Sequence, residues 1–161
     1  MSHRPRVRTC LWFDSQGEEA ARFYVSLLPD SRIETVSRPE PDGPALTVDF
    51  ILAGAPYQVL NGGPIFPHTP AASISVLTKD QAETDALWAA LVADGGKEGQ
   101  CGWLTDRFGV SWQIVPEPLL EMQNAPDRAA ALRAQQAMLQ MGKIDVAALE
   151  AAFRGEFEGE G

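Results

Sequence analysis

The chain contains very few of the side chains that nucleophilic catalysis and metal binding use. Its 161 residues include only two histidines, His3 and His68, and two cysteines, Cys10 and Cys101. A serine or cysteine nucleophile needs an imidazole within hydrogen-bond reach. His3 stands close to the N-terminus, so His68 is left as a weak candidate for that role. Two cysteines are too few for a disulfide framework, which favours a cytoplasmic protein.

Positive charge is also scarce, because 13 lysines and arginines face 22 acidic residues and the net charge is -9 at pH 7. Nucleic acid and anionic membranes are therefore not expected partners, since the general electrostatic attraction has the wrong sign. The one basic cluster, Arg4, Arg6 and Arg8, is expected to be a solvated N-terminal tail. No apolar stretch is long enough to span a bilayer, and no apolar signal core follows the basic start.

Glycine-rich phosphate-binding patterns are missing as well. The sequence has no Walker loop and no glycine fingerprint after a strand, so nothing in it supports a nucleotide or dinucleotide cofactor. A methyltransferase that uses S-adenosylmethionine would need such a loop and an acidic residue for the ribose. The sequence therefore gives no support to either class of cofactor.

A short pattern does occur twice. The residues GAPYQVL at 54–60 return as GVSWQIV at 109–115, and each copy has a turn glycine, an aromatic residue, a glutamine and two aliphatic residues. Internal repeats indicate folds that are built from similar units. The sequence therefore predicts two related halves with Gln58 and Gln113 at matching points of their last strands.

The same order of elements precedes each copy of the pattern. Apolar residues at helical spacing predict helices over 18–28 and 81–93. Alternation and aliphatic runs predict strands, in the first half at 9–13, 32–36, 46–52 and 56–60, and in the second at 72–77, 97–100, 103–105 and 110–115. Each half is thus predicted to be βαβββ. An ordinary α+β domain with a chance match is the alternative.

The predicted fold class is α+β, in which two βαβββ half-domains form a curved mixed sheet around a cleft. The first half covers residues 9–61 and the second half covers residues 71–116. A linker rich in glycine and proline joins them at 62–70, and its apolar Ile65 and Phe66 suggest that it packs over another part of the protein.

A C-terminal helical extension is predicted over residues 117–155. One helix is expected to begin at an Asn124 cap and to end before Gly142, and a second is expected to begin at an Asp145 cap and to end at Gly155. The acidic, glycine-rich tail at 156–161 is expected to be disordered.

The matching glutamines indicate a pocket. Side chains alternate between the two faces of a strand, so Gln58 shares a face with Leu60, and Gln113 shares one with Ser111 and Val115. The opposite faces suit packing under helices, which leaves the glutamines to line a cleft, although solvent-facing edge glutamines are the alternative. The predicted pocket residues are Thr9, Leu11, Phe13, Gln58, Leu60, Asn61, Ser73, Ser75, Cys101, Trp103, Ser111 and Gln113.

Two residues are candidates for a catalytic base if the protein is an enzyme. Asp106 follows the turn at 101–103 and is the first candidate, and His68 is the second. Aspartate commonly organises turns, so Asp106 is as readily interpreted as the cap of the hairpin at 107–109.

Motifs spread over residues 9–153 match a known family. They include WFD at 12–14, EAARFY at 19–24, LNGGP at 60–64, QCGWL at 100–104, DRFG at 106–109 and WQIVP at 112–116. In these motifs the chain resembles the PhnB-like branch of the vicinal oxygen chelate superfamily (glyoxalase, bleomycin resistance and dioxygenase proteins). Members of this branch often carry the label 3-demethylubiquinone-9 3-methyltransferase.

The resemblance implies a divalent metal held by one residue from the first and last strand of each half. These positions fall on or near Thr9, Gln58, Ser73 and Gln113, and none of them is a histidine or a carboxylate. A shift of one residue would offer Cys10 or Asn61 and still no good set of ligands. Because metal affinity depends on ligand type and charge, a bound metal is disfavoured and no cofactor is predicted.

The combined prediction is a protein that binds a small, mostly apolar molecule in its cleft without a metal. A metal-dependent enzyme of the glyoxalase or dioxygenase type is the alternative, and a lyase or isomerase is favoured over a methyltransferase. A purely structural module is disfavoured, because it would not need an inward-facing polar pair. The resemblance and the apolar C-terminal helices also predict a homodimer.

Overall fold

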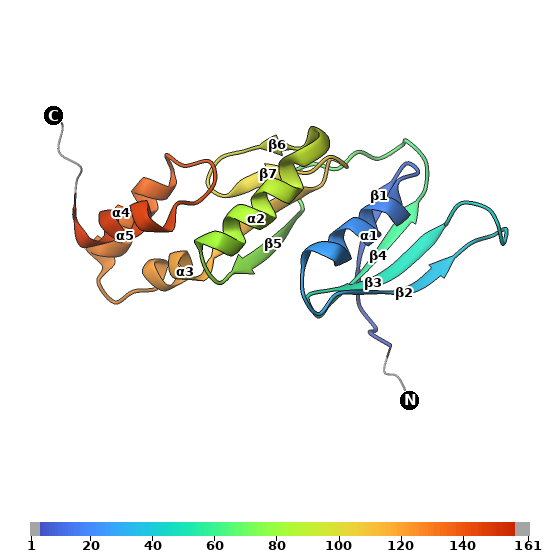
Figure 1. Ribbon diagram of the computed structural model, residues 1–161, viewed down its shortest axis with the longest axis horizontal. Coiled ribbons are helices and arrows are strands. Elements are labelled where there is room, and N and C mark those ends of the chain that lie inside the picture. The colour runs from blue at the N-terminus through green and yellow to red at the C-terminus, as the bar shows by residue number, and fades with distance from the viewer. Residues whose placement is uncertain (1–3, 157–161) are drawn as a thin grey trace. The chain divides into compact units, whose positions relative to one another are not determined.

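The computed structural model describes residues 4–156. The chain divides into two compact units, the first ending at His68 and the second beginning at Thr69. Figure 1 shows the helices and strands of both units, coloured by residue number. Within residues 4–156, no helix combines the length and the apolar character that crossing a membrane would require.

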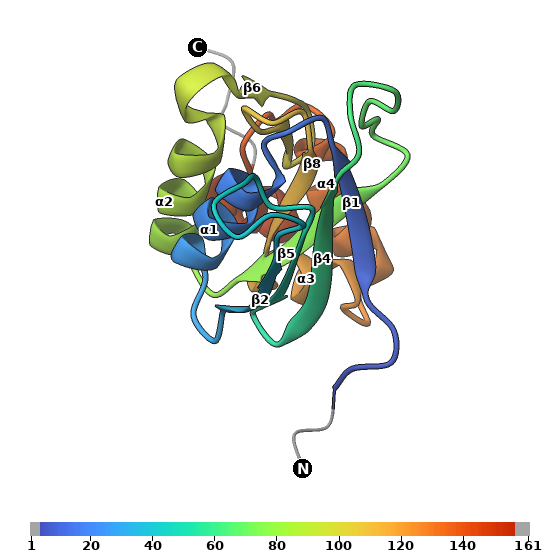
Figure 2. The same ribbon diagram turned by 90° about the vertical axis from the view of Figure 1, so that its right-hand side faces the viewer.

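The first unit is a four-stranded mixed sheet with one helix. Its elements are β1 (Thr9–Phe13), α1 (Gly17–Leu27), β2 (Arg32–Ser37), β3 (Thr47–Leu52) and β4 (Ala55–Asn61). The strand order is β1-β4-β3-β2, with β1 parallel to β4 and the other neighbours antiparallel. The helix α1 lies beside these strands (Figure 2) and contacts all four of them.

The second unit repeats this topology. Its elements are β5 (Ser73–Thr78), α2 (Gln81–Val92), β6 (Lys97–Glu98), β7 (Trp103–Thr105) and β8 (Ser111–Pro116), with a short 3-10 turn at Ala93–Gly95. The strand order β5-β8-β7-β6 again pairs the first and last strands in parallel. The α+β prediction of two βαβββ halves is confirmed.

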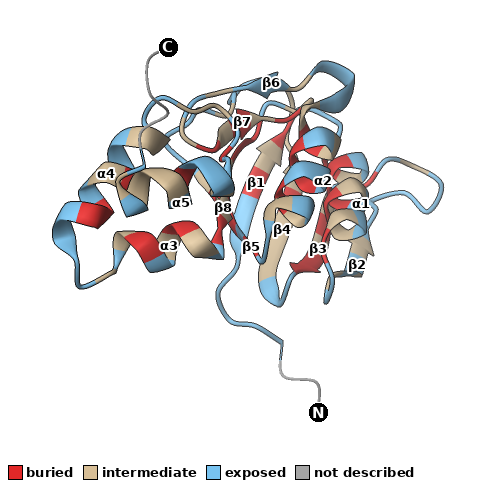
Figure 3. Cartoon of the chain, turned by 60° about the vertical axis from the view of Figure 1, so that its left-hand side comes forward, coloured by how far each residue is buried: buried red, intermediate tan, exposed pale blue. Residues whose placement is uncertain are grey.

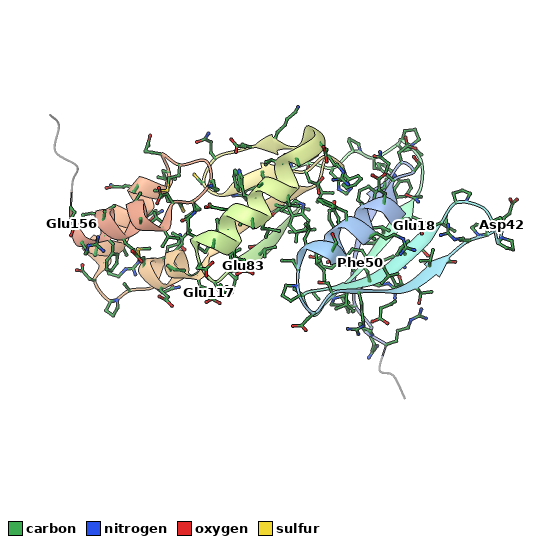
Figure 4. All side chains as sticks on the ribbon, in the orientation of Figure 1. Glu18, Asp42, Phe50, Glu83, Glu117 and Glu156 are labelled. Carbon is green, nitrogen blue, oxygen red and sulfur yellow. The ribbon has the colours of Figure 1, made fainter. Side chains whose placement is uncertain are left out.

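The largest buried side chains of each sheet share one of its faces, and Figure 3 colours the buried residues red. In the first unit Val48, Phe50 and Val59 are almost fully buried, and the Phe50 ring, labelled in Figure 4, stacks on Tyr57 with centroids 5.4 Å apart. In the second unit Trp112 and Ile114 are buried in the same way. This agrees with the expectation that the aromatic and aliphatic faces pack under the helices.

The C-terminal extension consists of α3 (Glu117–Gln123), α4 (Arg128–Met138) and α5 (Val146–Arg154). They share an apolar cluster made by Leu119, Met122, Ala134, Ile144 and Leu149. The Asp145 cap and the end at Gly155 are confirmed, since Asp145 accepts from the Ala148 N–H and Gly155 is left-handed with φ 77°.

Two predicted boundaries in this extension were wrong. Asn124 ends α3 by donating to the carbonyl of Leu120, and Asp127 caps α4 instead. The helix α4 also stops at Met138, because the next residues leave it to bind the turn before β7. There the carbonyls of Met141 and Gly142 accept from the N–H groups of residues 101 and 102. The predicted disordered tail lies, apart from Glu156, outside the described residues.

Candidate functional site

The face of the first sheet opposite α1, called the open face below, carries a row of polar side chains. The strand register places Cys10 of β1 beside Gln58 of β4, and Gln58 beside Asp49 of β3. Thr35 of β2 continues the row next to Asp49. The Nε2 of Gln58 donates to Oδ1 of Asp49 at 2.7 Å, which fixes both side chains.

Two arginines from the segment before β1 lie against Asp49. Nη2 of Arg4 is 3.4 Å from Oδ2 of Asp49, and Nε of Arg8 is 3.7 Å from its Oδ1. The Asp49 side chain is 16% exposed, whereas that of Arg4 is 72% exposed and that of Arg8 is 36% exposed. The prediction of a solvated basic tail agrees with the exposure of Arg4, but it did not include the carboxylate partner on the sheet that Arg4 and Arg8 share.

A cavity of about 420 Å³ lies at this part of the first unit. Charged groups gather around it, because Arg4, Arg8, Arg32, Glu34 and Asp49 all contribute to its lining. Pro5, Thr35, Phe50, Ile51, Pro56 and Tyr57 complete that lining. Phe50 and Tyr57 belong to the face that packs on α1, so the lining is not confined to the open face. None of the twelve residues predicted for the pocket lines this cavity. Concave sites that combine apolar walls with a few convergent polar groups are typical of small-molecule binding.

The sequence did not predict that Arg4 and Arg8 would contact Asp49 and line a cavity. The alternation of side chains along a strand was the one available signal. Arg8 stands two residues before Cys10, so it lies on the open face if the alternation of β1 is extended backward. Contact with Asp49 depends on tertiary structure, and no local pattern contains it.

Four predicted pocket residues of the first unit lie on the other face of the sheet. Leu11 is paired with Val59, and both are buried on the side of α1, so Thr9 and Phe13 share that side. Placing these three residues beside Gln58 was wrong, because the β1–β4 register aligns Cys10, not Thr9, with Gln58. Leu60 does share the open face with Gln58.

Asn61, the fourth of these residues, holds backbone groups together. Its Oδ1 accepts from the N–H of Gly17 at 2.8 Å, and its Nδ2 donates to the carbonyl of Ala45 at 3.0 Å. Gly17 is the first residue of α1, where N–H groups lack partners within the helix. The side chain of Asn61 therefore secures the start of α1.

The second unit places five of its six predicted pocket residues on one face of its sheet. Ser73 pairs with Ser111, Ser75 pairs with Gln113, and Gln113 also pairs with Trp103, so all five side chains share one face. The Nε2 of Gln113 donates to Oγ of Ser73 at 2.9 Å. Each repeated glutamine thus bonds to a neighbouring strand, but one bonds to a carboxylate and the other to a hydroxyl.

Cys101 lies in the turn before β7 and is tied to the C-terminal extension. Its backbone is left-handed, with φ 57°, and its N–H donates to the carbonyl of Met141 at 2.8 Å.

Asp106 is buried, with 2% exposure, at the turn before β8. Its Oδ1 accepts from the backbone N–H groups of Phe108 at 2.8 Å and Val110 at 3.0 Å. Its Oδ2 accepts from Nε1 of Trp112 at 2.9 Å. Three donors on a buried carboxylate favour the turn-organising interpretation of Asp106 over that of a catalytic base.

His68, the other candidate base, lies beside Phe13, with ring centroids 5.2 Å apart. Its Nε2 is buried and has no hydrogen-bond partner among residues 4–156. Among the described residues, no hydrogen bond joins the His68 ring to a carboxylate or to a nucleophile. The geometry therefore gives His68 no defined chemical role.

The residues present do not fit the divalent metal that the superfamily resemblance implies. Thr9 faces away from Gln58, and Gln58 and Gln113, whose amide nitrogens bond to Asp49 and Ser73, could offer a metal only neutral amide oxygens. Across the described part of the chain, no three or more histidine, cysteine, aspartate or glutamate side chains are grouped so that they could hold a metal ion. Histidine nitrogens and carboxylates are the usual ligands of catalytic metals.

The pKa of the Cys10 thiol depends on the charged groups near the open face. Burial raises its pKa above the ordinary value, the positive charge of Arg8 lowers it, and the negative charge of Asp49 raises it. We therefore expect Arg8→Gln to slow alkylation of Cys10 by iodoacetamide below pH 8, and Asp49→Asn to accelerate it, each by about two- to fivefold. Peptide-resolved mass spectrometry measures this, with Cys101 in the same samples and Arg6→Gln as controls. Faster labelling in Arg8→Gln would contradict this account of the charges.

Comparison with known proteins agrees with this fold. The family model described as 3-demethylubiquinone-9 3-methyltransferase matches residues 5–115, more than half of the chain. A PhnB protein from Bacillus cereus that carries the same description is 30% identical, with a TM-score of 0.63 over 70% of this chain and 99% of that one. No protein with a curated description matches.

More distant structures share the fold alone. A protein from Pseudomonas aeruginosa is 23% identical, with a TM-score of 0.57, over 70% of this chain and 98% of that chain. The fosfomycin resistance protein FosX from Listeria monocytogenes is 13% identical, with a TM-score of 0.55, over 78% of this chain and 100% of that chain. The chain belongs to the 3-demethylubiquinone-9 3-methyltransferase family, in the PhnB-like branch of the vicinal oxygen chelate superfamily.

Proposed function

We propose that this protein binds a small molecule on the open face of its first sheet and that it does so without a divalent metal. The observation that supports this most strongly is the cavity of about 420 Å³ lined by residues of β2, β3, β4 and the segment before β1. This volume is within the range of roughly 300–1,000 Å³ found for ligand pockets. Asp49 of the polar row lines this cavity, and Cys10 and Gln58 lie beside it on the open face but outside the lining.

The lining points to a more polar ligand than the sequence predicted. Ile51 and Pro56, paired across β3 and β4, supply an apolar patch. Three arginines and two carboxylates lie around it. A ligand with an apolar body and at least one polar group satisfies both parts of the lining, because a buried polar group needs a hydrogen-bond partner.

Binding is favoured over catalysis by the state of the candidate bases. Asp106 is occupied by three N–H donors, and His68 has only an aromatic neighbour among the contacts described above. The methyltransferase label of the family has no glycine-rich cofactor loop to support it in this sequence. A lyase, isomerase or dioxygenase activity would need a base or metal ligand beyond these residues.

Filling the cavity tests the proposed function. Thr35 is exposed and lines the cavity, so Thr35→Trp should occupy the space with little cost to the fold. We expect small aromatic fragments to bind the wild-type chain in ligand-observed NMR, and we expect Thr35→Trp to weaken that binding by about tenfold or more.

Ser37→Trp is the matched control for this experiment. Ser37 lies two residues further along β2, on the same face, and is exposed but does not line the cavity. Fragment binding should survive in Ser37→Trp. Equal loss in both variants, or unchanged binding in Thr35→Trp, would contradict the proposed site.

We also propose that the protein is a homodimer and that its C-terminal helices contribute to the interface. Leu132 of α4 and Leu139 just after it are each 53% exposed, so they leave apolar surface available. A two-fold interface is the commonest form of protein association. Light scattering of the full chain should give twice the mass of one chain, and a monomer at micromolar concentration would contradict this proposal.

A further inference from the structure

The cavity of the first unit contains more guanidinium than carboxylate. Arg32 pairs closely with Glu34, with Nε 2.6 Å from Oε1. Asp49 is the only carboxylate in the lining left for both Arg4 and Arg8. The cavity therefore carries one positive charge in excess, although the whole chain has a net charge of -9.

The two arginines hold Asp49 only loosely. Their contacts of 3.4 and 3.7 Å are longer than the roughly 2.7–2.9 Å of a strong charge-assisted hydrogen bond. Asp49 is better bonded to Gln58, at 2.7 Å. A guanidinium has five N–H donors, so these contacts use only a small part of the donor capacity of Arg4 and Arg8.

From these observations we infer that the ligand of this cavity is a small organic acid whose carboxylate binds the guanidiniums of Arg4 and Arg8. The inference rests on the proposed function and names the ligand class of the same site. A planar carboxylate accepts two parallel N–H bonds from a guanidinium, and it supplies the one negative charge that the cavity lacks.

The remaining lining indicates the rest of the molecule. Ile51 and Pro56 lie side by side on the open face, adjacent to the positions of Asp49 and Gln58. An acid with an aliphatic or aromatic body would cover this apolar patch while its carboxylate meets the arginines. A dianion such as a phosphate monoester suits the cavity less well, because Asp49 and Glu34 would repel the second charge.

The test compares acids with their uncharged amides on the full chain. The probes are benzoate, 3-phenylpropanoate and 4-phenylbutanoate, and each is compared with its primary amide. Binding is measured from the NMR shifts of the backbone amides and of the arginine Nε–H groups. At least one acid should bind about tenfold more tightly than its amide, and added salt should narrow the difference. Phenyl phosphate, the dianionic probe, should bind more weakly than that acid.

Two arginine variants and a control locate the acid. Arg8→Gln and Arg4→Gln should each weaken acid binding by about tenfold and leave amide binding within twofold. Arg6→Gln removes the same charge from the same segment, but Arg6 does not line the cavity, so acid binding should remain within twofold of wild type. Thermal unfolding confirms that each variant is folded, and the exposed position of Arg4 keeps that variant informative if Arg8→Gln is unstable.

The outcomes separate the inference from the proposed function. Equal affinities of acid and amide, both lost in Thr35→Trp, would overturn the organic-acid inference and leave the proposed binding site standing. Acid binding that weakens equally in Arg6→Gln and Arg8→Gln would show only general charge attraction and would also overturn the inference. If neither the acids nor the amides bind, both the organic-acid inference and the proposed binding function are overturned.

Discussion

Replacing Asp106 with alanine is expected to lower the free energy of unfolding by about 3–5 kcal/mol. The substitution would leave three donors without an acceptor, namely the backbone N–H groups of Phe108 and Val110 and the indole N–H of Trp112. Trp112 is fully buried on β8, so water cannot easily replace the lost carboxylate. Urea unfolding followed by tryptophan fluorescence measures the loss.

Glu98→Ala provides a matched control for Asp106→Ala. Glu98 also accepts from a tryptophan, with Oε1 2.8 Å from Nε1 of Trp88, but Glu98 is exposed on the edge strand β6. Water can replace that acceptor, so we expect a loss of only about 1 kcal/mol. If Asp106→Ala were as stable as wild type but lost a ligand-dependent activity, Asp106 would have to be reassigned as a catalytic group.

The second large effect is expected from Gly62→Ala, because a methyl group at this position would collide with an indole ring. An added Cβ would lie 2.2 Å from Cζ2 and 2.3 Å from Cη2 of Trp12. Trp12 cannot move freely, since its Nε1 donates to the carbonyl of Gly63 at 2.9 Å and its ring meets Phe66 edge-on at 5.0 Å.

We expect Gly62→Ala to cost about 2–4 kcal/mol, the sum of overpacking and a weakened hydrogen bond. Near-ultraviolet circular dichroism should show that the environment of Trp12 has changed. Gly43→Ala is the control: its added Cβ would meet Cβ of Glu40 at 3.2 Å and the carbonyl oxygen of Glu40 at 3.3 Å, in a turn whose residues 41, 42 and 44 are exposed, so about 1 kcal/mol or less is expected. Equal stability of Gly62→Ala and wild type would contradict the packing of the segment after β4 on Trp12.

Local patterns were sufficient to predict the elements of both units. The alternation in β8 places Trp112 and Ile114 on one face and Ser111 and Gln113 on the other, and the structure buries the aromatic face as expected. The repeat around Gln58 and Gln113 then predicted that both units share one topology, which the strand orders confirm.

The features that could not be predicted from the sequence depend on strand register and on contacts between segments that are distant in the chain. Both Thr9 and Cys10 suit an edge strand, and only the register between β1 and β4 decides which of them lies beside Gln58. The role of Arg8 depends in the same way on Asp49, which is far from it in the chain. Asn124 and Asp127 are both good caps, and the structure uses the first to end α3 and the second to begin α4.

We expect a small molecule to bind to the open face of the first sheet without a metal. The most direct measurement is a map of backbone amide NMR shifts during titration with 4-phenylbutanoate, first in the presence of a chelator and then with added zinc. We expect saturable shifts of the backbone amides of Thr35, Asp49, Ile51 and Tyr57 with the chelator present, and no change in these shifts when zinc is added. Shifts that appear only when zinc is added, or that map to the second unit alone, would contradict this expectation.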